Sequence, residues 1–130
     1  GSEASRPLAG LVWEEVVGAL SRYRIAWVAD TDAGAKYRRG AGGADYYGIL
    51  RRTAGVPAVL AELAFLSNPP EADLLARPEV QRDEGEALAR AIVRFLTTDD
   101  PGSGFTEPYP RVTPAGPGGG SRGCVDPPLR

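Results

Sequence analysis

The chain has 130 residues, of which 42% are apolar and 25% charged, as is typical of one soluble globular domain. Its 15 basic and 17 acidic residues give a net charge of −2, which offers no electrostatic basis for binding nucleic acid or an anionic membrane. There is no histidine, and the single cysteine excludes an intrachain disulfide. No apolar run is long enough to span a bilayer, and no signal peptide is visible.

The first predicted element is a helix over residues 5–23, where apolar residues recur at three- and four-residue spacing. Ser5 is its predicted N-cap, because a serine hydroxyl can accept a hydrogen bond from a free N–H of the first turn. Glu14 and Glu15 are expected to face solvent. The pattern therefore predicts one amphipathic helix at the start of the chain.

The middle of the chain predicts loops and short strands. Residues 24–28 indicate a strand or a packed loop, and the glycine-rich, charged stretch 30–45 indicates a loop. Residues 46–50, aromatic and β-branched, predict a short strand or an ordered approach to one. The most apolar stretch is 56–66, and a proline near its start disfavours a helix. We expect residues 58–63 to form a fully buried strand with helices on both faces.

Two helices are predicted after this strand. Asn68 suits an N-cap, a proline follows it, and Glu71 lies three residues on, as in a capping box. This helix is expected to reach residue 75 or 76. A longer helix is predicted over residues 78–96, with its two late arginines on the outer side.

The last part of the chain differs in composition from the rest. Residues 99–130 are rich in proline and glycine and poor in aliphatic side chains, so burial cannot offset the entropy of ordering them. We therefore expect a folded part, residues 1–98, and a disordered tail, residues 99–130. Cys124 lies in this tail with no histidine to activate it, so a catalytic thiol is not expected.

Glu62 is the strongest candidate for a catalytic residue, because it is the one ionisable residue in the stretch 56–66. A carboxylate buried without a partner is costly, so such a residue is neutralised, paired or bound to something. Ligands of open α/β sheets gather beyond the carboxyl ends of strands, and Glu62 lies near that end of the predicted strand. The alternative is a structural ion pair with Arg51 or Arg52.

Other motifs are weaker. The glycines of residues 40–43 have neither dinucleotide-binding nor phosphate-loop spacing. Asp30, Asp32 and Asp45 do not match the calcium-loop pattern, so a solvated loop is the better interpretation. No motif in this chain predicts a metal site.

Two stretches carry a family resemblance: YGILR at residues 47–51 and VPAVLAELAFLSN at residues 56–68. They resemble the C-terminal signature of zinc-dependent N-acetylmuramoyl-L-alanine amidases, with Ala64 where glycine is usual. The resemblance extends over about residues 5–97. It implies an α/β fold class, namely the C-terminal part of a three-layer amidase fold in which helices flank a mixed sheet.

The resemblance also implies roles for residues. The family's acid/base glutamate falls on Glu62, and Arg51 and Asn68 are candidate substrate contacts. The family's zinc ligands are two histidines and a glutamate from upstream motifs, and none of these motifs is present here. We therefore expect Zn²⁺ to be bound upstream of this chain, which is expected to begin after the second histidine motif and to be inactive alone.

The implied activity is hydrolysis of the amide bond between N-acetylmuramic acid and the L-alanine of the peptidoglycan stem peptide. The expected partner is peptidoglycan, the expected location is extracellular or cell-wall-associated, and the full-length form is expected to be a monomer. One alternative is a catalytically dead wall-binding module. Another is an intracellular α/β interaction domain in which Glu62 forms an ion pair. If the parent sheet has strands upstream, the isolated chain is expected to be poorly soluble.

Overall fold

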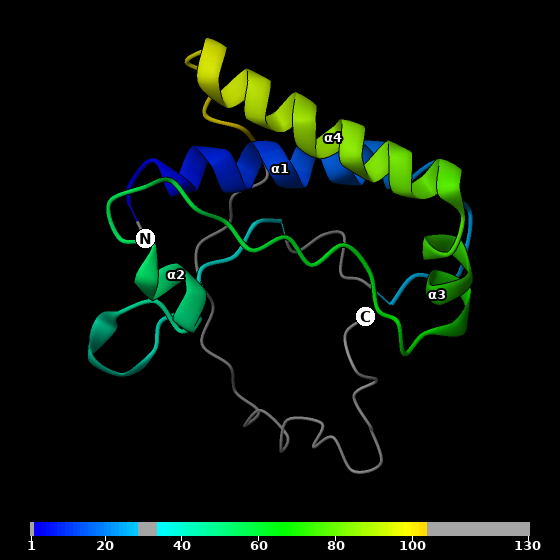
Figure 1. The fold of residues 1–130 in the computed structure, drawn as a ribbon, viewed down its shortest axis with the longest axis horizontal. Coiled ribbons are helices and arrows are strands. Elements are labelled where there is room, and N and C mark those ends of the chain that lie inside the picture. Colours follow the sequence, from blue (N-terminus) through cyan, green and yellow to red (C-terminus); the bar gives the residue numbers. More distant parts are fainter. Residues whose placement is uncertain (1, 29–33, 104–130) are drawn as a thin grey trace, which may run out of the picture.

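The computed structural model describes residues 2–28 and 34–103, and this part of the chain is mainly helical (Figure 1). No strand is formed among the described residues, and an isolated antiparallel β-bridge joins Arg39 to Asp45. The elements in chain order are α1 (Ser5–Leu20), the 3-10 turn η2 (Ala41–Gly43), α2 (Gly48–Arg52), α3 (Pro69–Leu75) and α4 (Pro78–Thr97).

The two long helices, α1 and α4, lie side by side and run antiparallel (Figure 1). Ion pairs along the interface fix this direction: Glu15 of α1 pairs with Arg90, whereas Arg22, just after α1, pairs with Asp83. The buried faces meet where Ala87 and Ala91 of α4 are fully covered. Alanine at this i, i+4 spacing leaves room for the larger α1 side chains, so the helices approach closely.

The hydrophobic core lies between these helices and α3. Leu11 of α1 and Val80 of α4 are fully buried, and Leu74 of α3 is 1% exposed. The stripe predicted from the sequence is the buried face of α1, whose members are Leu8, Leu11, Val12, Val16, Ala19 and Leu20. The helix is stabilised because its apolar stripe is buried against α4 and removed from water.

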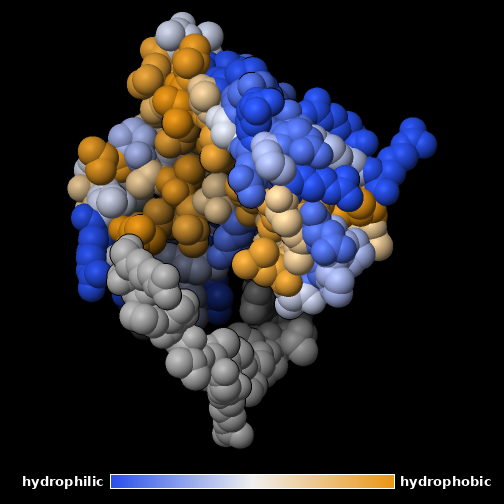
Figure 2. All heavy atoms as spheres, turned by 45° about the vertical axis from the view of Figure 1, so that its right-hand side comes forward, coloured by the Kyte–Doolittle hydropathy of each residue, from blue (hydrophilic) through white to orange (hydrophobic). Residues whose placement is uncertain are grey.

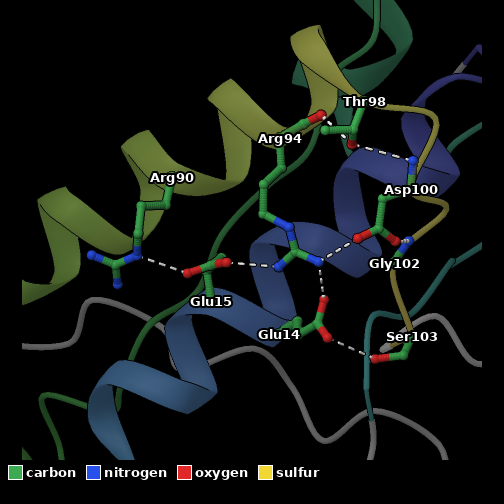
Figure 3. Close-up of polar contacts among 8 residues, drawn as sticks. All are labelled: Glu14, Glu15, Arg90, Arg94, Thr98, Asp100, Gly102 and Ser103. Atoms are coloured by element: carbon green, nitrogen blue, oxygen red, sulfur yellow. Dashed lines mark hydrogen bonds and ion pairs between the residues drawn. The ribbon is translucent and has the colours of Figure 1, made fainter.

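A network around Arg94 ties α1 to α4 and to the chain that follows α4 (Figure 3). The Arg94 guanidinium donates to Glu15 at 2.6 Å, to Glu14 at 2.9 Å and to Asp100 at 2.5 Å. Arg90 adds a second bond to Glu15 at 2.8 Å. The expectation that Glu14 and Glu15 simply face solvent is therefore wrong, because arginines that flank the buried face of α4 reach across to them.

An extended segment, residues 57–65, runs along α1. At its start, the Ala58 N–H donates to Ser5 Oγ at 3.1 Å, beside the first turn of α1. Its inward side chains, Val59 and Leu63, pack against the core. At about 3.3 Å per residue, these nine extended residues reach about 26 Å, close to the roughly 24 Å length of a 16-residue helix such as α1. The segment can therefore follow α1 from one end to the other.

The predicted helices are confirmed, with small shifts at their ends. α1 ends at Leu20 rather than residue 23, and its N-cap is Ala4, so the assignment of that position to Ser5 is wrong by one residue. α3 and α4 begin at the predicted prolines. Proline at the first helical position needs no N–H partner, which explains why it marks these starts well.

Both predicted strands are wrong for the described structure. Residues 46–50 enter α2 at Gly48, where helical bonding begins with the Arg51 N–H donating to the Tyr47 carbonyl. Residues 58–63 are extended without strand pairing, and Leu60 and Glu62 are exposed. A strand needs a neighbour that accepts and donates along its edge, and the described residues supply none here.

Large apolar side chains also remain on the surface, and Figure 2 shows orange side chains gathered over part of the molecule. Leu60, Phe65 and Leu66 in and after the extended segment are 44%, 48% and 76% exposed. On α4, Ile92 and Leu96 are 50% and 71% exposed. Exposed apolar side chains that gather on part of a surface are typical of faces that another polypeptide covers.

No helix among the described residues combines the length and hydropathy that a membrane span requires.

Candidate functional site

Glu62 lies in the extended segment that follows α1, with its side chain exposed. Within residues 2–28 and 34–103 it forms no hydrogen bond or ion pair. The predicted burial of this carboxylate is therefore wrong, because the strand that would have enclosed it has no neighbours in the described chain. The structural ion pair with Arg51 or Arg52 is likewise not formed among these residues. The Glu62 carboxylate is therefore accessible to solvent in the described chain.

Arg51 bonds to backbone carbonyls rather than to Glu62. Its Nη1 donates to the Asp45 carbonyl at 2.9 Å and to the Tyr46 carbonyl at 2.5 Å. These bonds join α2 to the loop before it, and the Arg38 guanidinium lies over the Tyr46 ring, 3.5 Å from its centroid. A guanidinium presents five N–H donors in a fixed plane, so it suits the bridging of two carbonyls. Arg51 thus shapes the loop that precedes the segment carrying Glu62.

Asn68 occupies the N-cap position of α3, as predicted, but its side chain makes no cap bond. Instead its Nδ2 donates to the Ala26 carbonyl at 2.8 Å. Asn68 therefore holds the start of α3 against the chain that leaves α1. No hydrogen bond or ion pair among the described residues joins Glu62 to Arg51 or Asn68, so the structure does not itself assemble the three predicted site residues into one cluster.

Glu71 is a fully buried carboxylate that the sequence interpretation missed. Its side chain is fully buried, and its two oxygens accept the backbone N–H groups of Val28 and Phe65. The predicted capping box is therefore wrong: the Asn68 N–H donates to the Phe65 carbonyl at 3.0 Å, not to Glu71. A glutamate three residues after an N-cap has a ready local explanation, and nothing in the sequence marks its long-range partners.

A polar groove of about 430 Å³ lies between α1 and α4, and Glu62, Arg51 and Asn68 do not line it. Hydrogen bonds from Arg90 and Arg94 hold the pKa of Glu15 below its usual value. At the other end of the groove, a hydrogen bond from Arg22 and a weaker effect of the hydrogen bond from Tyr23 lower the pKa of Asp83. The groove is thus lined by matched ion pairs, which is the arrangement expected of an interhelical contact rather than of a catalytic centre.

The residues present do not fit a zinc site. No three His, Cys, Asp or Glu side chains within the described part of the chain are grouped as metal ligands. The whole sequence lacks histidine, and Cys124, Asp30 and Asp32 lie outside the described residues. A catalytic zinc site needs three protein ligands, usually including histidine, and the described residues show no such set.

Comparison with known proteins identifies the family. The family model described as N-acetylmuramoyl-L-alanine amidase matches residues 2–94, which covers α1, α2, α3, most of α4 and the extended segment with Glu62. The chain belongs to the N-acetylmuramoyl-L-alanine amidase family. A search of curated proteins and a search of solved structures gave no significant match.

Membership of this family indicates a hydrolase of the amidase kind. Its family consists of hydrolases that act on peptidoglycan of the cell wall and are generally zinc-dependent. The match confirms the resemblance drawn from residues 47–51 and 56–68 and places both stretches inside the family region.

Proposed function

We propose that this chain supplies Glu62 as the acid/base carboxylate of an amidase that cleaves the bond between N-acetylmuramic acid and the L-alanine of the stem peptide. The observation that carries the proposal is the family match over residues 2–94, with Glu62 inside the family-like string VPAVLAELAFLSN. The exposure of Glu62, without a partner among the described residues, supports it further, because a catalytic carboxylate must be free to meet water and substrate.

The proton chemistry follows from the reaction. A water oxygen attacks the scissile carbonyl carbon while the Glu62 carboxylate takes one of its protons. The carboxylic acid so formed then gives that proton to the departing amine nitrogen as the C–N bond breaks. Glu62 thus ends in its starting state, and a carboxylate positioned in this way contributes about 10²–10⁴-fold to such reactions.

We further propose that the zinc ligands lie on polypeptide outside these 130 residues. Two features support this: the complete lack of histidine, and the free edges of the extended segment. Within the described chain, Val59 to Ala64 make no hydrogen bonds. Backbone groups that are to be buried need partners, and strands from the metal-binding part of an amidase would complete the three-layer α/β fold that the resemblance implies.

The finer features of the activity belong to the same proposal. The complete enzyme is proposed to be a monomer that acts outside the cell or on the wall, with Arg51 and Asn68 near bound peptidoglycan. Each of these two side chains already bonds backbone carbonyls. Their proposed contribution is therefore to shape the loops around the substrate. Their remaining N–H groups are proposed to donate hydrogen bonds to it.

The test combines this chain with the metal-binding part of a family amidase and zinc, using muropeptides as substrate. We expect release of stem peptide, and a loss of about 10²–10⁴-fold in kcat when Glu62→Gln replaces the wild type. Glu79→Gln on α4 is the matched control, since Glu79 is also exposed and this substitution likewise removes one negative charge. Full activity in Glu62→Gln contradicts the proposed role.

The catalytically dead module is the second candidate, because the chain has no histidine of its own. It predicts binding to insoluble peptidoglycan with no hydrolysis in any combination with a metal-binding partner. Peptide release in the combined assay, lost in Glu62→Gln, excludes this module.

A further inference from the structure

Glu71 connects three parts of the chain that are far apart in sequence. It lies in the first turn of α3, and its side chain is fully buried. One carboxylate oxygen accepts the Val28 N–H, and the other accepts the Phe65 N–H at 2.6 Å. A charge-assisted bond that a backbone N–H donates to a buried carboxylate is among the stronger hydrogen bonds in proteins. Glu71 therefore fixes the end of the extended segment against the chain that leaves α1.

Two bonds made by Asn68 reinforce the same junction. The Asn68 N–H donates to the Phe65 carbonyl, closing a tight turn, and the side chain reaches the Ala26 carbonyl at 2.8 Å. The peptide groups around Phe65 are thus held on both sides. Residues 26–28 and 65–71 form one hydrogen-bonded unit, which we call the Glu71 junction.

The extended segment is otherwise loosely held. From Val59 to Ala64 the described chain makes no hydrogen bonds, and the anchors on either side are the Ala58 bond to Ser5 and the Phe65 bond to Glu71. Glu62 lies three residues before Phe65 and four after Ala58. Its backbone position therefore depends on the Glu71 junction and on the packing of its neighbour Leu63 against the core.

We propose that Glu71 is a positioning residue for Glu62. This inference rests on the proposed function, because it assigns Glu71 a role only if Glu62 takes part in hydrolysis. By holding Phe65, Glu71 sets the path of the segment and hence the place at which the Glu62 carboxylate meets the substrate. A displacement of about 1 Å at a reacting group can cost about 10²-fold in rate, so such an anchor matters to the chemistry.

The chemistry of the junction requires a carboxylate of this length. Two N–H donors arrive from different segments, and a carboxylate offers an acceptor to each. Glutamine keeps the shape but has one carbonyl oxygen, so its NH₂ group would face an N–H donor. Glu71→Gln therefore keeps at most one of the two bonds, while Glu71→Asp keeps both acceptors but withdraws them by one methylene.

The first arm of the test is NMR on this chain. In wild type we expect slow amide exchange at Val28 and Phe65 and ordered backbone at Glu62 by heteronuclear NOE. Glu71→Gln should raise exchange at Phe65 by about tenfold or more and lower the NOE at Glu62. Asp73→Asn, a neutralisation on the exposed side of the same helix, should change neither. Unchanged values in Glu71→Gln overturn the inference.

The second arm is kinetic and uses the combined assay described for Glu62, well below the melting temperature of each variant. A positioning role predicts that Glu71→Gln lowers kcat about tenfold or more with KM nearly unchanged, and that Glu71→Asp recovers part of the loss. A merely structural role lowers the melting temperature but leaves kcat per folded molecule unchanged, and that result overturns the inference.

The two proposals fail in different ways. If Glu62→Gln keeps full activity, the proposed function itself is wrong, whatever Glu71→Gln does. If Glu62→Gln is inactive and Glu71→Gln keeps wild-type kcat, the proposed function stands and the positioning role of Glu71 is wrong.

Discussion

Gly102 lies so close to Gly10 of α1 that a Cβ on Gly102 would come within 2.8 Å of the Gly10 carbonyl carbon. It would also come within 2.7 Å of the Leu11 nitrogen. Gly102 has a φ of +68°, a conformation that other residues adopt only with strain. Beside it, Asp100 and Ser103 bond to Arg94 and Glu14. The chain after α4 is therefore packed back onto α1.

This contact predicts that Gly102→Ala lowers the free energy of unfolding by at least about 1–3 kcal/mol, since backbone strain and a clash with helix backbone act together. Gly85→Ala is the control. Gly85 lies within α4 and has open space where an added Cβ would point, so alanine there should stabilise by up to about 1 kcal/mol. Urea unfolding followed by circular dichroism measures both. A Gly102→Ala variant as stable as wild type contradicts the packed arrangement.

Glu84 of α4 predicts a pH-dependent effect on stability. It is 7% exposed, its Oε1 has no partner among the described residues, and burial raises its pKa above the usual 4.5. Because the folded pKa is raised, Glu84 opposes folding increasingly as the pH rises above 4.5. Glu84→Gln should therefore gain stability relative to wild type as the pH rises from 4 to about 7.

A buried unsatisfied group costs on the order of 1–3 kcal/mol, so Glu84→Leu should be more stable than wild type at neutral pH by an amount in this range. Glu79→Gln, on the exposed side of α4, should instead lower stability by only about 0.3–1 kcal/mol, because it removes a favourable negative charge from the first turn of the helix. The measurement is chemical unfolding at several pH values. Equal stability of Glu84→Gln and wild type across the range would show that Glu84 is not buried in solution.

Arg94 predicts an effect of salt. Without it, Glu14, Glu15 and Asp100 lose their shared cation and repel one another (Figure 3). Arg94→Gln should lower the melting temperature at low salt, and the deficit should shrink in 1 M NaCl, where the Debye length falls to about 3 Å. Arg52→Gln on α2, exposed and outside the network, should show no such dependence. A deficit that is independent of salt points to lost packing instead.

The same network predicts loss of stability in acid. Arg90 and Arg94 lower the pKa of Glu15, and Arg94 and the Gly102 N–H lower the pKa of Asp100. Their contribution is present above the ordinary values of 4.5 and 3.8 and is lost as the pH falls through the lower, folded values. The difference between wild type and Arg94→Gln should therefore shrink below about pH 4, which thermal melts at stepped pH would reveal.

The exposed apolar residues predict self-association of the isolated chain. Leu66, at 76% exposed, and Leu60, at 44%, are large apolar side chains open to solvent in the described chain. Leu66→Asp should reduce concentration-dependent association in sedimentation velocity without lowering the melting temperature, because the side chain loses little burial on unfolding. Leu74→Ala, in the core, should instead cost about 2–5 kcal/mol in stability. A monodisperse wild type at high concentration contradicts the prediction.

The sequence predicted what local chemistry decides. The buried stripe of α1 is encoded in three- and four-residue spacing, and the prolines at residues 69 and 78 mark the starts of α3 and α4. The sequence motif around Glu62 is long and specific enough to indicate the amidase family, which the match over residues 2–94 confirms. The roles of Glu62, Arg51 and Asn68 stay predictions that the combined assay tests.

The errors have one physical cause, which is that strands and long-range bonds depend on partners distant in the chain. Residues 58–63 have the composition of a buried strand, yet without a neighbour they remain extended, and Glu62 is exposed. Residues 46–50 turn instead into α2, where helical bonds satisfy the backbone locally. A pattern of side chains does not reveal whether a partner strand is present.

The sequence by itself therefore determined the helices α1, α3 and α4, the apolar face of α1 and the family, because these depend on residue types at short spacing. Only the tertiary structure decided that Glu71 is fully buried while Glu62 is exposed, and that Arg94 joins α1 to the chain beyond α4. The physical reason is that a carboxylate's partners here come from segments 6 to 43 residues away, and only folding brings them within hydrogen-bonding distance.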